Sequence, residues 1–237
     1  MPPPAHRGLP AAAGAPPGAV LIRVGVHGAT GRMGRLVVAE VEAAPDLTVA
    51  WTAGRDVPES LDADVIVDFS TPLGLLRLLD RAPCPVVTGT TGVELPPTVG
   101  VAYLHAPNFS LGVAVLARLV RDAAASLPGY DIEVVELHHK HKRDAPSGTA
   151  LRLVEGLGPR VDGRTGPRTP GEIGMHAVRG GDIVGEHRVY LCGPGERLEL
   201  GHVATHRGLF AAGAVTAARW IVGKPPGRYT LEDVLGG

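Results

Sequence analysis

The stretch "VGVHGATGRMG" places three glycines, Gly28, Gly31 and Gly34, between an apolar segment and a helix-like one. The preceding residues 19–26, "AVLIRVGV", are rich in β-branched side chains and predict a buried strand. Residues 32–44 repeat apolar side chains at helical spacing and stop at Pro45, so they predict a helix. A strand, a glycine turn and a helix in this order are typical of a parallel α/β sheet.

The next segments continue the same alternation. Strands are predicted at 46–53, 63–70, 85–89 and 101–106, with a helix at 72–82. Strands that alternate with helices favour a Rossmann-like, doubly wound parallel sheet.

The glycine turn is suited to a phosphate group. Gly28 allows a tight turn, Gly31 lets the backbone approach a pyrophosphate, and Gly34 lets the helix pack closely on the strand. The helix N-terminus offers free N–H groups with partial positive charge, and Arg32 adds a charged donor. We therefore expect a dinucleotide here, with a glycine-rich turn that binds no ligand as the alternative.

The choice of dinucleotide depends on the end of the second strand. An NAD site usually carries an acid about 20 residues after the turn, and Gly54 stands there, within "AWTAGRD". Arg55 follows and suits a 2′-phosphate, which favours NADPH, whereas Asp56 keeps NADH possible. Arg55 as a solvated loop charge remains open.

The alternation changes after Asn108. A long helix at 111–127 and a strand at 131–139 are followed by a helix at about 147–157 and a loop at 158–174. Three strand-like runs then follow without intervening helices, at 175–180, 185–193 and 197–205, before a last helix at 208–223. This order predicts a second, smaller α+β domain. We expect it at 110–206, the dinucleotide-binding domain at 20–109 and 207–237, and a disordered or non-native tail at 1–19.

Composition narrows the possible partners. The formal net charge is −1 and aromatic residues make up 4%, which disfavours nucleic acid and anionic membranes. No apolar run approaches the roughly 18 residues of a membrane helix. The two cysteines are too few for a disulfide framework, so we expect reduced thiols in the cytoplasm.

Residues 136–151, "ELHHKHKRDAPSGTAL", crowd histidines and lysines at the end of a predicted strand. Metal binding is disfavoured, because neighbouring side chains such as His138 and His139 point to opposite faces of a strand and the lysines would repel a cation. We therefore expect no metal site. A solvated polar loop remains open.

The interpretation that we favour is an anion pocket with acid–base chemistry. His138 ends the strand with an imidazole suited to proton transfer, and Lys142 adds a donor and a positive charge. Ser147 can cap the next helix, whose first turn offers Gly148 N–H and Thr149 N–H and Oγ to a carboxylate. Such a pocket suits a small acid with more than one carboxylate.

Taken together, the motifs resemble the dihydrodipicolinate reductase family from Val20 to the C-terminus. The motifs are "GATGRMG", "VDFSTP", "GTTG", "APNFSLGV", "ELHHKHKRDAPSGTAL" and "RGLFAAGAVTAARW". The chain departs from the family pattern at Thr30, where many relatives carry glycine, and at Gly54, where the acid is missing. The second departure puts a preference for NADH in doubt.

The resemblance implies a role for each matching position. The proton donor or acceptor falls on His138, the donor lysine on Lys142, a substrate-binding histidine on His139, and the carboxylate-binding pair on Gly148 and Thr149. The nucleotide turn covers Gly28, Ala29, Thr30, Gly31, Arg32 and Met33, and the nicotinamide side covers Gly89, Thr90, Thr91, Ala106, Pro107, Asn108 and Phe109.

The activity implied by the resemblance is NAD(P)H-dependent reduction of 4-hydroxy-tetrahydrodipicolinate to tetrahydrodipicolinate, with loss of water, in lysine and diaminopimelate biosynthesis. It also implies a homotetramer formed through the sheet of the substrate domain. Two alternatives remain: another dicarboxylate amino-acid dehydrogenase, and an NADPH-binding sensor without turnover.

Overall fold

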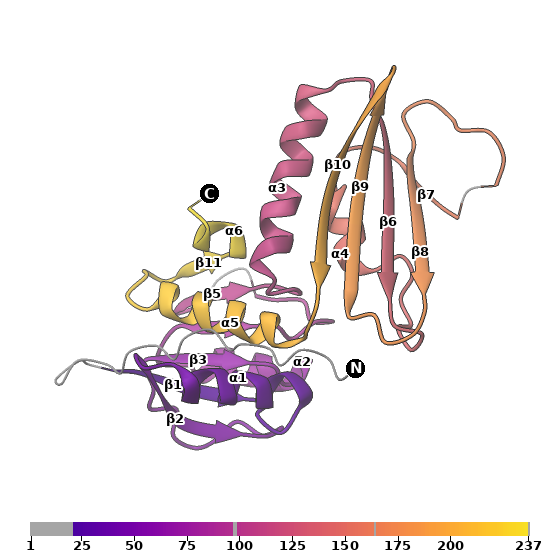
Figure 1. Cartoon of the computed structure of the whole chain (residues 1–237). Coiled ribbons are helices and arrows are strands. Elements are labelled where there is room, and N and C mark those ends of the chain that lie inside the picture. The colour runs from indigo at the N-terminus through magenta and orange to yellow at the C-terminus, as the bar shows by residue number, and fades with distance from the viewer. Residues whose placement is uncertain (1–20, 97–98, 164, 237) are drawn as a thin grey trace. The chain divides into compact units, whose positions relative to one another are not determined.

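The computed structural model describes residues 21–96, 99–163 and 165–236 (Figure 1). They divide into two compact units. The first comprises the residues up to Pro107 together with Ala214–Thr230, and the second comprises Asn108–Gly213 and the residues from Leu231 on. The expectation for 1–19 lies outside the described residues.

The first unit is built on a parallel six-stranded sheet, as the alternation predicts. Its strands are β1 (Ile22–His27), β2 (Leu47–Ala53), β3 (Val65–Asp68), β4 (Val86–Thr88), β5 (Ala102–His105) and β11 (Gly227–Tyr229). They lie in the order β11-β5-β4-β3-β1-β2, with every neighbouring pair parallel. The order reverses between β1 and β3, so the carboxyl ends of these strands flank the position where such sheets bind ligands.

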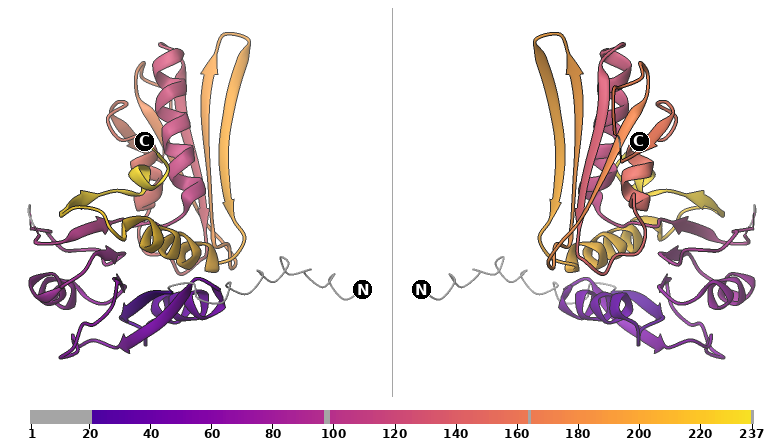
Figure 2. Two further views of the ribbon diagram at one scale, coloured as in Figure 1. Left: turned by 90° about the vertical axis from the view of Figure 1, so that its left-hand side faces the viewer. Right: turned by 90° about the vertical axis from the view of Figure 1, so that its right-hand side faces the viewer.

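Helices α1 (Arg32–Ala43) and α2 (Pro72–Arg81) lie on opposite faces of this sheet (Figure 2). The connection from β1 to β2 runs in one direction across the sheet and that from β3 to β4 in the other. Because such connections are right-handed, the two helices must cover different faces. Thr71 caps α2, since its hydroxyl accepts a hydrogen bond from Gly74 N at 3.2 Å.

The second unit contains a mixed five-stranded sheet. Its strands are β6 (Asp131–His138), β7 (Arg160–Asp162), β8 (Ile173–Arg179), β9 (Gly185–Gly193) and β10 (Glu196–Ala204), in the order β10-β9-β6-β8-β7. Strand β6 runs antiparallel to β9 and parallel to β8. The fold class predicted from the sequence, a Rossmann-like sheet plus a smaller α+β part, is thereby confirmed.

Helices α3 (Leu111–Ser126) and α4 (Gly148–Leu153) cover one face of the second sheet. Leu116 and Val120 of α3 and Leu153 of α4 pack against Val134 of β6 and Val189 of β9, and all five are buried. Because side chains alternate along a strand, Val135 and the other odd-numbered residues of β6 point to the opposite face of the sheet. The side chains of Glu136 and His138 share the helix-covered face with Val134.

Three local features differ from the sequence predictions. Helix α4 ends at Leu153 instead of about 157, and Gly156 follows with a φ of +79°, a conformation that ends helices. The loop predicted at 158–174 contains the short strand β7 and the start of β8. Strand β11 had no counterpart in the prediction.

The C-terminus also differs. Residues 207–237 were expected in the first unit, yet α5 (Gly208–Ile221) is divided between the units and α6 (Leu231–Val234) belongs to the second. The reason is contact between α6 and α3, which includes an ion pair of 3.0 Å between Glu232 and Arg121.

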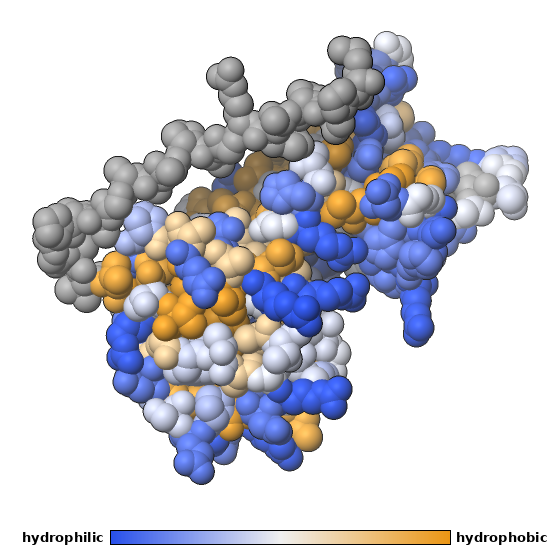
Figure 3. All heavy atoms as spheres, turned by 60° about the horizontal axis from the view of Figure 1, so that its bottom comes forward, coloured by the Kyte–Doolittle hydropathy of each residue, from blue (hydrophilic) through white to orange (hydrophobic). Residues whose placement is uncertain are grey.

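The surface is mixed. On the face seen in Figure 3, hydrophilic residues surround smaller groups of hydrophobic ones, as is usual for globular proteins. Within the described ranges, no helix combines the length and apolar character needed to cross a membrane.

Candidate functional site

The glycine turn of the first unit has the close backbone packing that a pyrophosphate site requires. Gly28 has a φ of +80°, and its carbonyl oxygen accepts a hydrogen bond from Gly31 N at 2.9 Å. A Cβ placed on Gly34 would lie only 2.1 Å from that carbonyl oxygen. Side chains are thus excluded where helix α1 meets the turn.

The start of α1 also fits an anion. Its N-cap residue, Gly31, has no side chain to accept from the first amides, and the first turn contains no acidic residue. Arg32 and Thr30 are exposed beside these amides, while Ala29 and Met33 are partly buried. The N–H groups and the helix dipole therefore suit the pyrophosphate of a dinucleotide.

Arg55 lies directly after the segment that binds the glycine turn. Gly28 N donates to Gly54 O at 3.1 Å, and Ala29 N donates to Ala53 O at 2.8 Å. A Cβ on Gly54 would lie 3.5 Å from Thr30 Oγ1, so this position faces the turn. Arg55 is exposed.

The other predicted cofactor residues of the first unit follow neighbouring strands. Gly89, Thr90 and Thr91 come after β4, while Ala106 and Pro107 come after β5. Gly89 N donates to Asp68 O at 2.9 Å, and Ala106 N donates to Thr88 O at 3.1 Å. Like the glycine turn after β1, they lie at the carboxyl edge of the sheet.

Sequence reasoning missed a buried polar network at the same edge. The carboxylate of Asp68, the last residue of β3, is fully buried and accepts four hydrogen bonds. The donors are His27, Ser70, Thr88 and Thr90, at 2.6–2.8 Å. The acid and the hydroxyls of "VDFST" and "TGTTG" were the only signal in the sequence.

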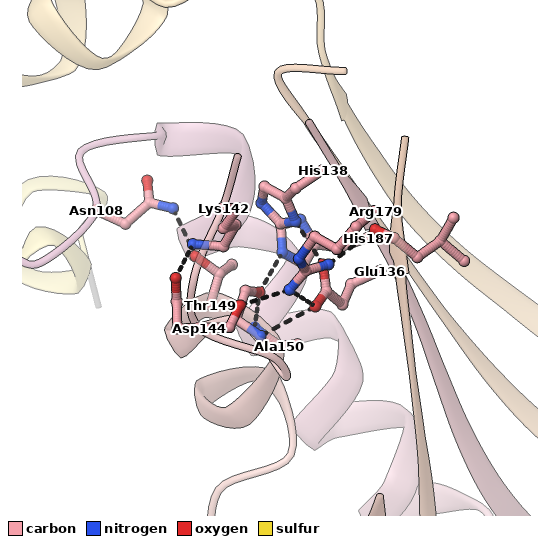
Figure 4. Close-up of polar contacts among 11 residues, drawn as sticks. Asn108, Glu136, His138, Lys142, Asp144, Thr149, Ala150, Arg179 and His187 are labelled. Atoms are coloured by element: carbon pink, nitrogen blue, oxygen red, sulfur yellow. Dashed lines mark hydrogen bonds and ion pairs between the residues drawn. The ribbon is translucent and has the colours of Figure 1, made fainter. Parts of the chain in front are cut away.

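In the second unit, His138 is held by a buried carboxylate that the prediction also missed (Figure 4). Nδ1 of His138 forms a short hydrogen bond with Glu136 Oε2, and the two residues are 8% and 0% exposed. Arg179 binds both oxygens of Glu136, at 2.9 and 2.7 Å. Ser147 N donates to the same carboxylate at 3.1 Å. Glu136 thus joins the end of β6 to β8 and to the start of α4.

These contacts set the charges of the pair. Burial lowers the pKa of His138, and the nearby charges of Lys142 and Arg179 act in the same direction, against the hydrogen bond that His138 donates to Glu136 and the negative charge of Glu136. Burial would raise the pKa of Glu136, but the hydrogen bonds from Arg179 and His138 outweigh it and lower that pKa. Glu136 is therefore an ionised acceptor, which keeps a proton on Nδ1 and leaves Nε2 for exchange.

Lys142 and Gly148 bind one carboxylate in the structure, that of Asp144. The Lys142 ammonium lies 2.8 Å from Asp144 Oδ1, and Gly148 N–H donates a hydrogen bond to the same side chain. The two donors are thus close enough to bind a single carboxylate group. Burial would raise the pKa of Asp144, but the hydrogen bond and charge of Lys142 and the backbone hydrogen bonds to the carboxylate together outweigh it and lower that pKa.

Thr149 and His139, the other two residues predicted to bind substrate, lie near Lys142 and Gly148. Thr149 Oγ1 accepts a hydrogen bond from Asn108 Nδ2 at 2.9 Å, and the neighbouring Phe109 is buried. The pKa of His139 is lowered by burial and then by the charge of Arg207, so Arg207 is a further nearby cation that the prediction missed.

His187 of β9 underlies the site. Its ring meets the ring of His138 edge-on, with centroids 5.2 Å apart, and its Nε2 lies 3.2 Å from Ser147 Oγ. Burial, followed by the charge of His138, lowers the pKa of His187 to about 4. His187 is therefore a neutral support for His138 and the helix cap. Within the residues that can be described, no three His, Cys, Asp or Glu side chains form a metal-binding group.

Two family models match the chain. "Dihydrodipicolinate reductase, N-terminus" matches residues 22–60 and "Dihydrodipicolinate reductase, C-terminus" matches residues 112–235. A 4-hydroxy-tetrahydrodipicolinate reductase of Nitratiruptor sp. is 41% identical over 91% of this chain and 100% of its own length. One of Akkermansia muciniphila is 44% identical over 91% of this chain and 98% of its own length.

A solved structure has the same fold. It is a dipicolinate-bound dihydrodipicolinate reductase from Paenisporosarcina sp. TG-14, with a TM-score of 0.72 and 22% identity. The likeness covers 89% of this chain and 98% of that one.

Proposed function

The chain belongs to the dihydrodipicolinate reductase family, and on that premise we propose that it reduces 4-hydroxy-tetrahydrodipicolinate to tetrahydrodipicolinate with loss of water. The family acts in lysine and diaminopimelate biosynthesis and uses a nicotinamide nucleotide. The observation that carries the proposal is the combination of the Glu136–His138 pair with two donors, Lys142 and Gly148, that bind one carboxylate. Another dicarboxylate amino-acid dehydrogenase, or an NADPH-binding sensor without turnover, would not require both the Glu136–His138 pair and these two carboxylate-binding donors.

When bound, a nicotinamide nucleotide would supply a hydride to the conjugated ring that remains after the 4-hydroxyl leaves as water. The addition leaves an enamine-like carbon that requires a proton. His138 donates this proton from Nε2, because Glu136 holds the other ring nitrogen. The pKa of His138 is lowered in the free protein, and a bound dianion would raise it towards the protonated form that the step needs.

Substrate binding falls to the cations and amides around His138. Lys142 neutralises a substrate carboxylate through its ammonium group, beside the proton donor His138, once its partner Asp144 is exchanged for the ligand. Gly148 and Thr149 bind a carboxylate through N–H and hydroxyl groups, and Asn108 orients the Thr149 hydroxyl. His139 and the nearby Arg207 add positive charge for the second carboxylate.

NADPH is the cofactor that the first unit fits best. The exposed Arg55 follows the backbone that binds the glycine turn, and Gly54 removes the acid that would repel a 2′-phosphate. Gly28 to Met33 hold the pyrophosphate, and the residues after β4 and β5 line the nicotinamide side. NADH remains a weaker substrate.

A homotetramer through the second sheet is part of the proposal. The face of this sheet opposite α3 and α4 carries a row formed by Val203, Glu186, Leu137 and Val178 on four adjacent strands. Val203 and Val178 are 51% and 44% exposed, and apolar side chains on an uncovered sheet face favour association. Sedimentation of Val178→Asp should show smaller species than the unaltered protein, and an unchanged sedimentation profile would contradict this assembly.

The decisive experiment on the activity is His138→Gln. With enzymatically generated substrate and NADPH, we expect kcat to fall roughly 10²–10⁴-fold, because the proton donor is lost. Binding of NADPH should not change, since no residue of the glycine turn is altered. The matched control is His141→Gln, an exposed histidine of the same segment, which should retain turnover. Undiminished turnover in His138→Gln would refute the proposed function.

A further inference from the structure

His27, the last residue of β1, is a fully buried histidine whose two ring nitrogens both face acceptors. Nδ1 lies 2.8 Å from Asp68 Oδ1. Nε2 lies 3.2 Å from the backbone carbonyl oxygen of Arg55. The ring therefore links β3 to the residue that we assign to the 2′-phosphate.

The ring of His27 is held at both nitrogens. A carbonyl oxygen can only accept, so Nε2 donates to Arg55 O. On the other side, the carboxylate of Asp68 that contacts Nδ1 also accepts from the hydroxyls of Ser70, Thr88 and Thr90, at 2.6, 2.8 and 2.7 Å. These hydrogen bonds fix the carboxylate, and the carboxylate fixes the ring.

Helix α2 packs closely against this ring. A Cβ on Gly74 of α2 would lie 3.1 Å from Cε1 of His27, so the helix approaches closely because it has glycine there. A buried polar ring in such a position requires hydrogen-bond partners. Asp68 is one of them, and the buried contact holds β1 against β3.

The consequence concerns the backbone at Arg55. The segment from Gly54 follows the end of β2, and Gly54 has no Cβ to restrict its dihedrals. Two contacts restrain the segment instead, from Gly28 N to Gly54 O and from His27 to Arg55 O. The hydrogen bond from His27 fixes the backbone at Arg55, and the backbone sets the direction in which the Arg55 side chain leaves it.

We propose that His27 is a positioning residue that fixes the backbone at Arg55 and thereby sets the discrimination between NADPH and NADH. The inference rests on the proposed function through the assignment of Arg55 to the 2′-phosphate. It goes further in assigning the discrimination also to a buried side chain that does not contact the nucleotide.

Two substitutions separate the contacts of His27. In His27→Asn the amide nitrogen can replace Nδ1 at Asp68 but cannot reach Arg55, whereas in His27→Gln it can replace Nε2 at Arg55. Dissociation constants for NADPH and NADH are measured by calorimetry on the full chain without substrate. We expect the preference for NADPH to fall at least about fivefold in His27→Asn, the effect of one hydrogen bond. His27→Gln should keep most of it, and equal preference in all three proteins would overturn the inference.

Arg55→Ala distinguishes failure of this inference from failure of the cofactor assignment. If Arg55→Ala lowers the preference for NADPH and His27→Asn does not, the role of His27 is wrong while the proposed cofactor site stands. If neither changes the preference, both the Arg55 assignment and the positioning role are wrong. The catalytic part of the proposed function, tested by His138→Gln, is unaffected by either result.

Discussion

Glu136 and His138 occupy alternate positions of β6 and meet through a short hydrogen bond on the helix-covered face of the sheet. Glu136 is fully buried, and Arg179 binds both of its oxygens. The imidazole is thereby fixed in one orientation and one tautomer, with Nε2 as the nitrogen that exchanges a proton.

Replacement of this carboxylate should separate catalysis from cofactor binding. In Glu136→Gln the amide can donate to Nδ1, which moves the ring proton to Nε2, and the charge that stabilises protonated His138 is lost. Loss of such an orienting carboxylate costs about 10⁴-fold in kcat in the best-known triad, and we expect at least about 10²-fold here. Steady-state kinetics with saturating substrate measure the effect.

A matched control lies on the same strand. Glu133 is three residues before Glu136, on the opposite face of β6, where it pairs with His176 at 2.7 Å. Glu133→Gln therefore removes an equivalent paired carboxylate without touching His138. If both variants lost turnover equally, the role of Glu136 would be structural only.

The charge of Arg55 should affect one cofactor only. Arg55→Ala removes a contact to the 2′-phosphate that NADH lacks, so we expect the Michaelis constant for NADPH to rise about tenfold or more and that for NADH to change little. Parallel titrations with the two nucleotides give the comparison. Equal effects on both would remove Arg55 from the 2′-phosphate site.

The parts of the fold and site that the sequence predicted are local. The strand, glycine turn and helix from residue 22 to 43 follow from periodicity and glycine spacing within one segment. His138, Lys142, Gly148 and Thr149 were predicted as site residues because they stand in one continuous string. Alternation along β6 also contained Glu136, two residues from His138, although the prediction did not use it.

The missing parts depend on contacts between distant segments. Arg179 reaches Glu136 from a strand 43 residues further along the chain, and His27 reaches Asp68 across 41 residues. Strand β11 has only three residues, too few to show a period. Helix α6 owes its place to α3. Local patterns carry no information on such pairings.

The glycine turn should respond to an added methyl group according to the available space. In Gly34→Ala the new Cβ would meet Gly28 O at 2.1 Å, so turn and helix must separate. Overpacking of this kind costs about 1–3 kcal/mol of unfolding free energy, and we expect NADPH affinity to fall with it. Gly54→Ala is the control, because its Cβ would find ordinary contacts with Thr30 at 3.5 Å and 3.6 Å. Urea unfolding and calorimetry measure the two effects, and equal losses in both variants would contradict the close approach at Gly34.

His187 should make the protein less stable in acid. Its pKa is lowered to about 4 in the folded state from 6.5, by burial and then by the charge of His138. As the pH falls below about 6.5, the unfolded chain binds a proton at this position and the folded chain does not, so stability is lost down to about pH 4. The slope is about 1.4 kcal/mol per pH unit, or about 3 kcal/mol over the window.

The measurement compares urea unfolding of the unaltered protein with His187→Gln at several pH values in this window, at one protein concentration. Glutamine can still contact Ser147 but does not titrate, so its free energy of unfolding should fall less steeply with acid. His138, His139 and His202 also have lowered pKa values, but they are present in both proteins and largely cancel from the difference. Parallel pH profiles would show that His187 is protonated equally in the folded and unfolded states, and the buried neutral support for His138 would be wrong.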